Sequence, residues 1–211
     1  MARKRDEDYD LRRQQIILGA LHVFAEKGFE EASNKEIAAA SEIGSPGLIY
    51  HYFQDKEDLL RAVLTHKLPL LQLAEKPEEI MKLPLPEALM YFGGIFFKQI
   101  NDPDTVAFMK LMFGEAIRRP QSAKVVFENG PLRGLQVLAK YFEIQIELGT
   151  LRRADPMLMA RQFMSPIMAY FLTREVFQQP QPLECEAFLE LTVSIFLTGM
   201  SQKDGEYDAP F

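Results

Sequence analysis

Apolar residues recur at intervals of three and four positions along the first part of this chain, which is the spacing of one helix face. The first such pattern predicts a helix from Asp10, a capping residue, to Lys27, just before the helix-ending residue Gly28. Its inner positions are Ile17, Ala20, Leu21 and Phe24. Residues 10–66 contain no strand pattern, so this part of the chain predicts an all-α fold.

Two short helices joined by a tight turn are predicted between residues 33 and 53. Ser33 with Glu36 three positions later is a capping box, in which each side chain binds an otherwise unsatisfied backbone amide. Ser45 followed by Pro46 places a capping residue before a proline at the first helical position, where no N–H is missed. The spacing therefore predicts a helix-turn-helix.

The segments on either side supply a platform for this pair. Asp55 predicts a cap for a further helix that begins at Lys56, so residues 10–66 hold four helices. Two helices as short as those of the pair cannot form a core alone, and a short helix presented on a platform is the geometry that enters a DNA major groove. On spacing and caps alone, two connector helices within an ordinary helical domain remain the alternative.

Beyond residue 66 the chain predicts a larger helical unit that is rich in Phe and Met. Prolines and capping residues delimit its helices at about 86–100, 103–119, 122–128, 131–148, 156–177 and 184–199. We therefore divide the chain into a helix-turn-helix domain at residues 1–66 and a helical domain at residues 67–211. In the second domain, Gly93-Gly94 predicts close packing or a cavity wall, and Pro166 predicts a kink.

Composition places limits on this picture. With 211 residues, 47% hydrophobic and 26% charged, the chain is typical of a soluble globular protein of one large or two small domains. The single cysteine, Cys185, excludes a disulfide within the chain and favours an intracellular location. Residues 1–10 lack the apolar core of a signal peptide, and the longest apolar block, residues 89–97, is too short to cross a membrane. We expect a cytoplasmic protein without membrane contact.

Net charge taken alone argues against nucleic-acid binding. The chain carries −6, and residues 1–66 hold nine Lys/Arg against twelve Asp/Glu. Phosphate contact is local, however, and the basic residues are clustered: Arg3 to Arg5, Arg12 with Arg13, and Lys35 and Lys56 beside helix starts. Charge therefore decides little in either direction.

Catalytic chemistry has few candidates in this sequence. None of the three histidines, His22, His51 and His66, pairs with another His or a Cys at metal-ligand spacing. Cys185 has no nearby His to activate it, and no glycine-rich phosphate loop is present. We expect neither an enzyme nor a metal or cofactor site.

A family resemblance adds to these physical arguments. The residues that carry it are Gly28-Phe29, Ser33, Ile37-Ala38, SPGLIYHYF at 45–53, Asp55-Lys56-Glu57 and Leu59-Leu60. Over about residues 10–66 they resemble the N-terminal signature of the TetR family of transcriptional regulators. The resemblance implies a three-helix DNA-binding domain joined through a fourth helix to a larger helical domain for ligand binding and dimerisation. The rest of the chain is similar to the family only in its length and helical pattern.

The resemblance also implies roles for individual positions. The residues it places at the DNA are Ser33, Ser45, Pro46, Gly47, Leu48, Tyr50, His51 and Lys56. Ser33 and Lys56 would bind phosphates at the starts of their helices, and Tyr50 and His51 would reach phosphates or bases. Gly47 would allow close approach. The residues expected in the core are Ile37, Ala38, Ile49 and Phe53, with Tyr52 partly buried.

Three departures from the family pattern affect the helix-turn-helix. The stretch from Ile37 to Phe53 is one residue longer than usual, and Glu42 stands near the position where glycine is usual. Pro46 and Leu48 replace frequent polar readers, so readout would depend on thymine-methyl contacts and DNA shape. Arg3 to Arg5 and Arg12 could add contacts from an N-terminal arm.

For the larger domain, the resemblance implies a cavity for a ligand. The candidate lining residues, for which plain core packing is the alternative, are Phe92, Phe96, Met109, Phe113, Phe142, Phe163, Met164 and Met168. We expect a small, largely apolar effector that releases a homodimeric repressor from a near-palindromic, double-stranded DNA operator. Dimerisation through the last two helices is implied, because one short recognition helix reads few bases. A helical adaptor whose helix-turn-helix does not bind DNA is the alternative function.

Overall fold

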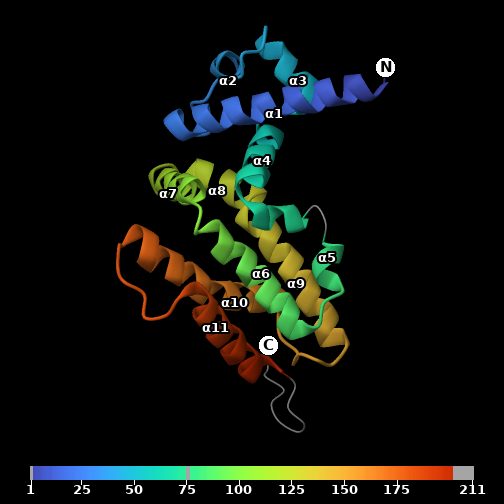
Figure 1. Ribbon diagram of the computed structural model, residues 1–211, viewed down its shortest axis with the longest axis vertical. Coiled ribbons are helices and arrows are strands. Elements are labelled where there is room, and N and C mark those ends of the chain that lie inside the picture. Colours follow the sequence, from blue (N-terminus) through green and yellow to red (C-terminus); the bar gives the residue numbers. More distant parts are fainter. Residues whose placement is uncertain (1, 75–76, 202–211) are drawn as a thin grey trace. The chain divides into compact units, whose positions relative to one another are not determined.

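The structure, a computed structural model, describes residues 2–74 and 77–201. Helices joined by turns make up this part of the chain (Figure 1), and the predicted all-α class is confirmed. The chain divides into two compact units: Met1–Leu68 with Ala107–Pro131, and Pro69–Val106 with Leu132–Phe211. The sequence did not predict that residues 107–131 would pack with the helix-turn-helix. The domain boundary after residue 66 stays a prediction.

The first unit is built from the N-terminal helices and the segment 107–131. Its elements are α1 (Ala2–Lys27), α2 (Asn34–Ala40), the 3-10 turn η1 (Pro46–Leu48), α3 (Ile49–Tyr52), α4 (Lys56–Lys67), the later part of α7 (Pro103–Arg118) and α8 (Pro120–Asn129). In Figure 1, α1 runs across the view with α2 and α3 above it and α4 below it. Two predicted helix starts are wrong. The helix α1 begins at Ala2 and not at Asp10, because no Gly or Pro before Asp10 interrupts it. The helix α8 begins at Pro120 instead of Ser122.

Gly19 accounts for the close packing of α1 on α2. A Cβ at this position would lie 2.7 Å from Ser41 N and 2.9 Å from the carbonyl carbon of Ala40, and side chains do not approach backbone atoms so closely. Only glycine therefore lets α1 cross the end of α2 at this distance. Of the predicted inner positions of α1, Ile17, Ala20 and Phe24 are buried and Leu21 is half-buried.

The second unit contains the remaining helices. They are η2 (Pro69–Ala74), α5 (Glu78–Met81), α6 (Leu85–Gln99), the first residues of α7, α9 (Pro131–Glu147), α10 (Pro156–Phe171), the π-helical turn η3 (Leu172–Val176) and α11 (Cys185–Met200). The starts of α7 and α10 are capped as predicted. Asp102 Oδ2 accepts a hydrogen bond from Thr105 N at 2.9 Å, and Asp155 Oδ1 accepts one from Leu158 N at 2.7 Å.

Aromatic side chains form the core of the second unit. Phe142 of α9 and Phe163 of α10 both pack on Phe196 of α11, with ring centroids 5.2 and 5.4 Å apart. Phe97 of α6 packs edge-on against Tyr170 of α10 at 5.2 Å. Such ring pairs add about 0.5–1.5 kcal/mol each to the effect of burial, so these four helices are held as one core.

The two adjacent glycines of α6 lie in different surroundings. A Cβ on Gly93 would overlap the buried side chain of Leu189 on α11, whereas a Cβ on Gly94 would meet no atom within 4 Å. Close packing, one of the two predicted reasons for this glycine pair, therefore applies to Gly93.

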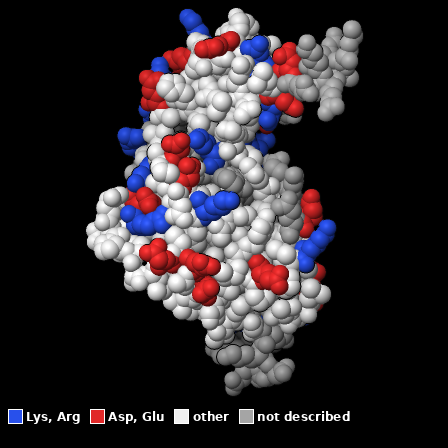
Figure 2. Space-filling model, viewed as in Figure 1, with Lys and Arg blue, Asp and Glu red and all other residues white. Residues whose placement is uncertain are grey.

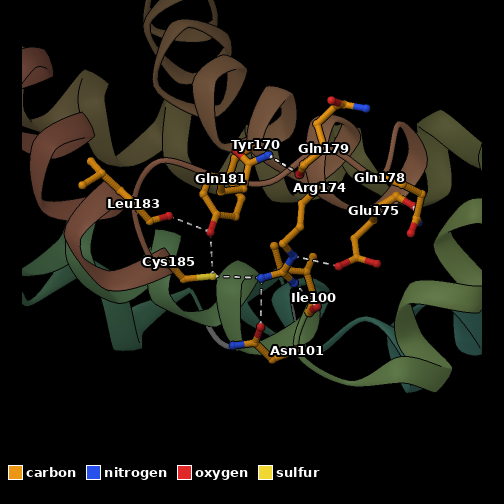
Figure 3. A network of polar contacts seen from close by, with 10 residues as sticks. All are labelled: Ile100, Asn101, Tyr170, Arg174, Glu175, Gln178, Gln179, Gln181, Leu183 and Cys185. Carbon is orange, nitrogen blue, oxygen red and sulfur yellow. Dashed lines mark hydrogen bonds and ion pairs between the residues drawn. The ribbon is translucent and has the colours of Figure 1, made fainter.

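The end of α10 differs from the single long helix predicted for residues 156–177. The helix continues through Pro166 and then changes at Leu172 into the π-helical turn η3. Arg174 of this turn anchors it (Figure 3). Its guanidinium donates hydrogen bonds to the carbonyl of Ile100, Asn101 Oδ1, Glu175 Oε1 and the half-buried Cys185 Sγ. This network fastens the corner between α6 and α7 to η3 and to the start of α11.

Candidate nucleic-acid interface

The start of α2 contains the predicted capping box. Glu36 N donates to Ser33 Oγ at 3.3 Å, and Ser33 N donates to Glu36 Oε2 at 3.1 Å. The Ser33 hydroxyl also donates to Glu36 Oε2 at 2.8 Å, so its proton is held inside the box. Hydrogen bonds from Lys27 and then from Ser33 lower the pKa of Glu36 to about 2, and the bond to Glu36 raises the pKa of Lys27. The box is thus tied to α1 through an ion pair.

The turn after α2 accommodates a side chain where glycine is usual. Glu42 adopts φ 54°, in the left-handed region that favours glycine. Glu42 N donates to the carbonyl of Ala39 at 3.1 Å, and Ile43 N donates to that of Ala38 at 3.0 Å, which is the bonding pattern of a Schellman helix end. Ile43 is buried and secures the end of α2. The unusual turn predicted here therefore closes the helix at a conformational cost.

The recognition segment begins with a 3-10 turn rather than with a capped α-helix. Ser45 occupies the N-cap position, but its hydroxyl makes no capping bond, so the predicted side-chain cap is wrong. Its carbonyl instead accepts a hydrogen bond from Leu48 N at 3.1 Å. Pro46 supplies the fixed φ at the first position. Pro46 and Gly47 are exposed and Leu48 is half-buried, so their surfaces face outward at the start of the segment.

Burial in and around α2 and α3 agrees with the predicted core set. The predicted core residues Ile37, Ala38, Ile49 and Phe53 are all buried. Tyr50 is 59% exposed, and its Oη accepts a hydrogen bond from Asn34 Nδ2 at 2.7 Å. His51 is exposed and Tyr52 is half-buried, as predicted for Tyr52.

Residues of α1 support the recognition segment from its other side, through contacts that the sequence did not predict. The ring of Tyr9 lies 4.7 Å from that of Tyr52 and 6.3 Å from that of His51. The Arg13 guanidinium lies over the ring of Phe53, 5.0 Å from its centroid. These contacts join positions about 40 residues apart, so no local spacing could reveal them.

Lys56 is partly engaged within the protein. Its Nζ donates to the carbonyl of Glu30 at 3.0 Å and lies 4.8 Å from the ring centroid of Phe29. Burial lowers the pKa of this ammonium. An ammonium has three donors, so the bond to the Glu30 carbonyl does not use all the N–H groups of Lys56.

Charged side chains of both signs are interspersed on the face of the molecule shown in Figure 2. Lys35 at the start of α2 is exposed, and Arg12 on α1 is half-buried. The backbone of Arg3 to Arg5 belongs to α1, and the side chains of these arm residues lie outside the described part of the structure. On this face, attraction of DNA would therefore depend on local groups.

The segment 107–131 holds the first unit together from the side of α4. Arg119 Nη1 donates to the carbonyl of Lys27 at 3.0 Å, and its Nη2 pairs with Glu31 Oε1 at 3.0 Å. Arg61 Nε of α4 donates to Asn129 Oδ1 of α8 at 3.1 Å. The helix-turn-helix thus shares its unit with a segment that lies far away in sequence.

The candidate ligand-lining residues lie in both units. Phe92, Phe96, Phe142 and Phe163 are buried in the second unit, while Met164 and Met168 on α10 are half-buried there. Met109 is buried and Phe113 is half-buried in the first unit. Core packing accounts for the four phenylalanines, and the lining role of all eight residues stays a prediction.

The described residues lack two other classes of site. None of the helices in this part of the chain has the length and apolar character that crossing a membrane requires. Within the same residues, His, Cys, Asp and Glu side chains form no group of three that could hold a metal ion.

Two models of known protein families match this chain. A model described as the AefR-like transcriptional repressor C-terminal domain matches residues 87–199, more than half of the chain, and one described as bacterial regulatory proteins of the tetR family matches residues 16–63. The chain belongs to the TetR family of transcriptional regulators. The resemblance noted for residues 10–66 is confirmed and extends through the C-terminal helices. As a TetR-family member the protein is a DNA-binding regulator and not an enzyme, so the adaptor alternative is set aside.

Relatives of this TetR-family chain match it over most of its length. The transcriptional regulator YvkB of Bacillus subtilis (strain 168) is 26% identical over 194 residues, which are 89% of this chain and 96% of that protein. HbdR of Aromatoleum sp. (strain CIB) is 27% identical over 190 residues, 89% of this chain and 81% of that protein. The solved structure of the flavonoid-responsive regulator FrrA matches with a TM-score of 0.62 and 26% identity, over 90% of this chain and 97% of its own. A TetR-family regulator from Mesorhizobium loti has the same fold, with a TM-score of 0.67 at 22% identity over 92% and 98% of the two chains.

Proposed function

We propose that this TetR-family regulator is a homodimeric repressor that a small, largely apolar molecule releases from a near-palindromic operator. One observation carries the DNA-binding part: Pro46, Gly47, Tyr50 and His51 are exposed on a scaffold of capped and buried elements. The matching C-terminal family model is named for a repressor, which supports repression.

The residues proposed to face DNA divide into two kinds of contact. The full set is Ser33, Ser45, Pro46, Gly47, Leu48, Tyr50, His51 and Lys56. Tyr50 and Lys56 carry donors for phosphate oxygens, which position the protein without reading sequence. Pro46 and Leu48 carry apolar surface for thymine methyl groups, and Gly47 allows the backbone to approach the base edges. Ser33 would contribute least through its hydroxyl, because that proton is bound to Glu36.

A mostly uncharged outer stripe on each of the last two helices supports dimerisation. The exposed residues are Leu158, Arg161, Gln162, Ser165 and Ala169 on α10, and Glu186, Ala187, Glu190, Leu191, Ser194, Ile195, Thr198 and Gly199 on α11. Leu158 is 63% exposed and Ile195 is 65% exposed, which is unfavourable for large apolar side chains in water. Small residues on the same outer stripes, such as Ala169 on α10 and Ala187 on α11, let helices approach closely. Two copies of this surface would bury both stripes in a four-helix interface.

An apolar effector is supported by the chemistry of the second unit. Its helices carry abundant Phe and Met, and Met164 and Met168 are only half-buried on α10. Met side chains adapt readily to ligands of varied shape. FrrA, a related structure at 26% identity, is named for its response to flavonoids, which are aromatic molecules.

The chain connectivity offers a route from effector to DNA. The chain crosses between the two units after Leu68, after Val106 and after Pro131, and α7 spans the second crossing as a continuous helix. A shift of α7 or α4 would reach the helix-turn-helix through Arg119 and Arg61, whose contacts lie within the first unit. The effector would favour a spacing of the two DNA-binding units that no longer fits adjacent half-sites.

Selection of binding sites from random duplex DNA, followed by mobility-shift titration, tests this function. A two-part, near-palindromic site with a steep salt dependence is the expected result. Alanine at both Tyr50 and Lys56 should weaken binding to all sequences alike, while changes at Pro46 or Leu48 should alter sequence preference. Unchanged binding of the Tyr50/Lys56 double variant would contradict the proposed contacts.

A further inference from the structure

A side-chain hydrogen bond joins α2 to α3 on the outer side of the helix-turn-helix. Asn34 Nδ2 donates to Tyr50 Oη at 2.7 Å. Asn34 is the first residue of α2 and is half-buried, whereas Tyr50 is 59% exposed in the recognition segment. The bond therefore leads from a sheltered position to the tip of a residue proposed to touch DNA.

The direction of this bond limits what the phenol can offer. A phenol has one O–H donor together with acceptor lone pairs, and a carboxamide NH₂ group has donors only. Because Asn34 Nδ2 fills an acceptor site on Tyr50 Oη, the hydroxyl proton cannot be satisfied by the same nitrogen. That proton must point to another acceptor, and the exposed position of Tyr50 directs it towards solvent. A phosphate oxygen of DNA carries only acceptor sites and matches it.

We propose that Asn34 is a positioning residue for operator binding. Its carboxamide holds the Tyr50 ring in place and directs the phenolic proton to a phosphate oxygen. The inference rests on the proposed phosphate contact of Tyr50 and adds how that contact is oriented. Because the ring and the proton are already ordered before DNA binds, binding loses less side-chain entropy. The affinity for DNA therefore rises without a new group touching the DNA.

A purely structural role for the same bond makes a different prediction, and Asn34→Asp separates the two. Aspartate has the same shape, but its carboxylate accepts hydrogen bonds and donates none. The Tyr50 hydroxyl would then donate inward to the carboxylate, so the link between α2 and α3 persists while the outward donor is lost. The variant should fold, because a carboxylate in the first turn of a helix is favourable.

The experiment measures operator affinity and thermal midpoint for four proteins: the natural chain, Asn34→Asp, Tyr50→Phe and the double variant. The added negative charge weakens DNA binding in both Tyr and Phe backgrounds, so the ratio of the two losses cancels it. We expect Asn34→Asp to lose about tenfold more affinity in the Tyr background than in the Phe background, the size of one hydrogen bond to a charged group. The thermal midpoints should stay close to that of the natural chain.

Each other outcome overturns the inference. A smaller loss in the Tyr background than in the Phe background would show that the bond is only a structural link. Equal losses would show that Asn34 acts independently of the phenol. If Tyr50→Phe alone leaves affinity unchanged, then the proposed Tyr50 contact itself fails; if it lowers affinity while the two losses are equal, only the role of Asn34 fails.

Discussion

Replacement of Gly19 by alanine tests how α1 supports the helix-turn-helix. Alanine is favoured over glycine in a helix by about 1 kcal/mol. At residue 19, however, the new Cβ would lie 2.7 Å from Ser41 N and 2.9 Å from the carbonyl carbon of Ala40, so backbone atoms must move. Overpacking of this kind costs about 1–3 kcal/mol. We expect a net destabilisation of about 1–2 kcal/mol for Gly19→Ala, because the displaced atoms belong to the main chain.

Gly94→Ala is the matched control, since Gly94 is also helical and its Cβ would meet no atom within 4 Å. It should gain up to about 1 kcal/mol. Urea unfolding at one fixed protein concentration gives both values, and fixed concentration matters because the stability of the proposed dimer would depend on it. A net loss of 2 kcal/mol would lower the thermal midpoint by about 4–8 °C for a chain of this size. Equal stabilisation by both alanines would refute the close approach of α1 to α2.

Three further predictions follow from single residues of the first unit. Glu42→Gly should raise the free energy of unfolding by up to about 1 kcal/mol. Glycine removes the strain of a side chain in the left-handed region, although it also increases the entropy of the unfolded chain. A lower free energy of unfolding, measured with urea, would contradict the left-handed conformation of this turn. Gly47→Ala should leave the thermal midpoint unchanged, since its Cβ would meet only Ser45 Oγ at 3.7 Å, yet should weaken operator binding; wild-type affinity would show that the DNA does not approach there. The folded-state pKa of Glu36 is about 2, below its ordinary 4.5, so its stabilisation is present above pH 4.5 and is lost as the pH falls towards 2. Stability of Glu36→Gln should therefore fall less steeply over that window in acid unfolding, and an unchanged slope would count against the ion pair with Lys27.

Local signals made much of the fold predictable. The capping box at Ser33 and the aspartate caps at Asp55, Asp102 and Asp155 depend on residues three positions apart, and all four form the expected bonds. Ser45 shows the limit of such signals, because its backbone enters a 3-10 turn in which the hydroxyl has no amide to cap.

Long-range contacts made the rest unpredictable. Residues 107–131 join the first unit through Arg119 and Asn129. Their partners are Lys27, Glu31 and Arg61, which lie 68 to 92 positions away along the chain. No periodicity connects such positions. The support of the recognition segment by Tyr9 and by Asn34 escaped prediction for the same reason, although both residues act on positions that the sequence did single out.

The footprint of the protein on its selected DNA site, measured together with the number of chains bound, tests the central claim most directly. A symmetric footprint of two half-sites about one helical turn apart, bound by two chains and lost on addition of a small apolar effector, is what the account predicts. A single asymmetric half-site occupied by one chain would contradict it.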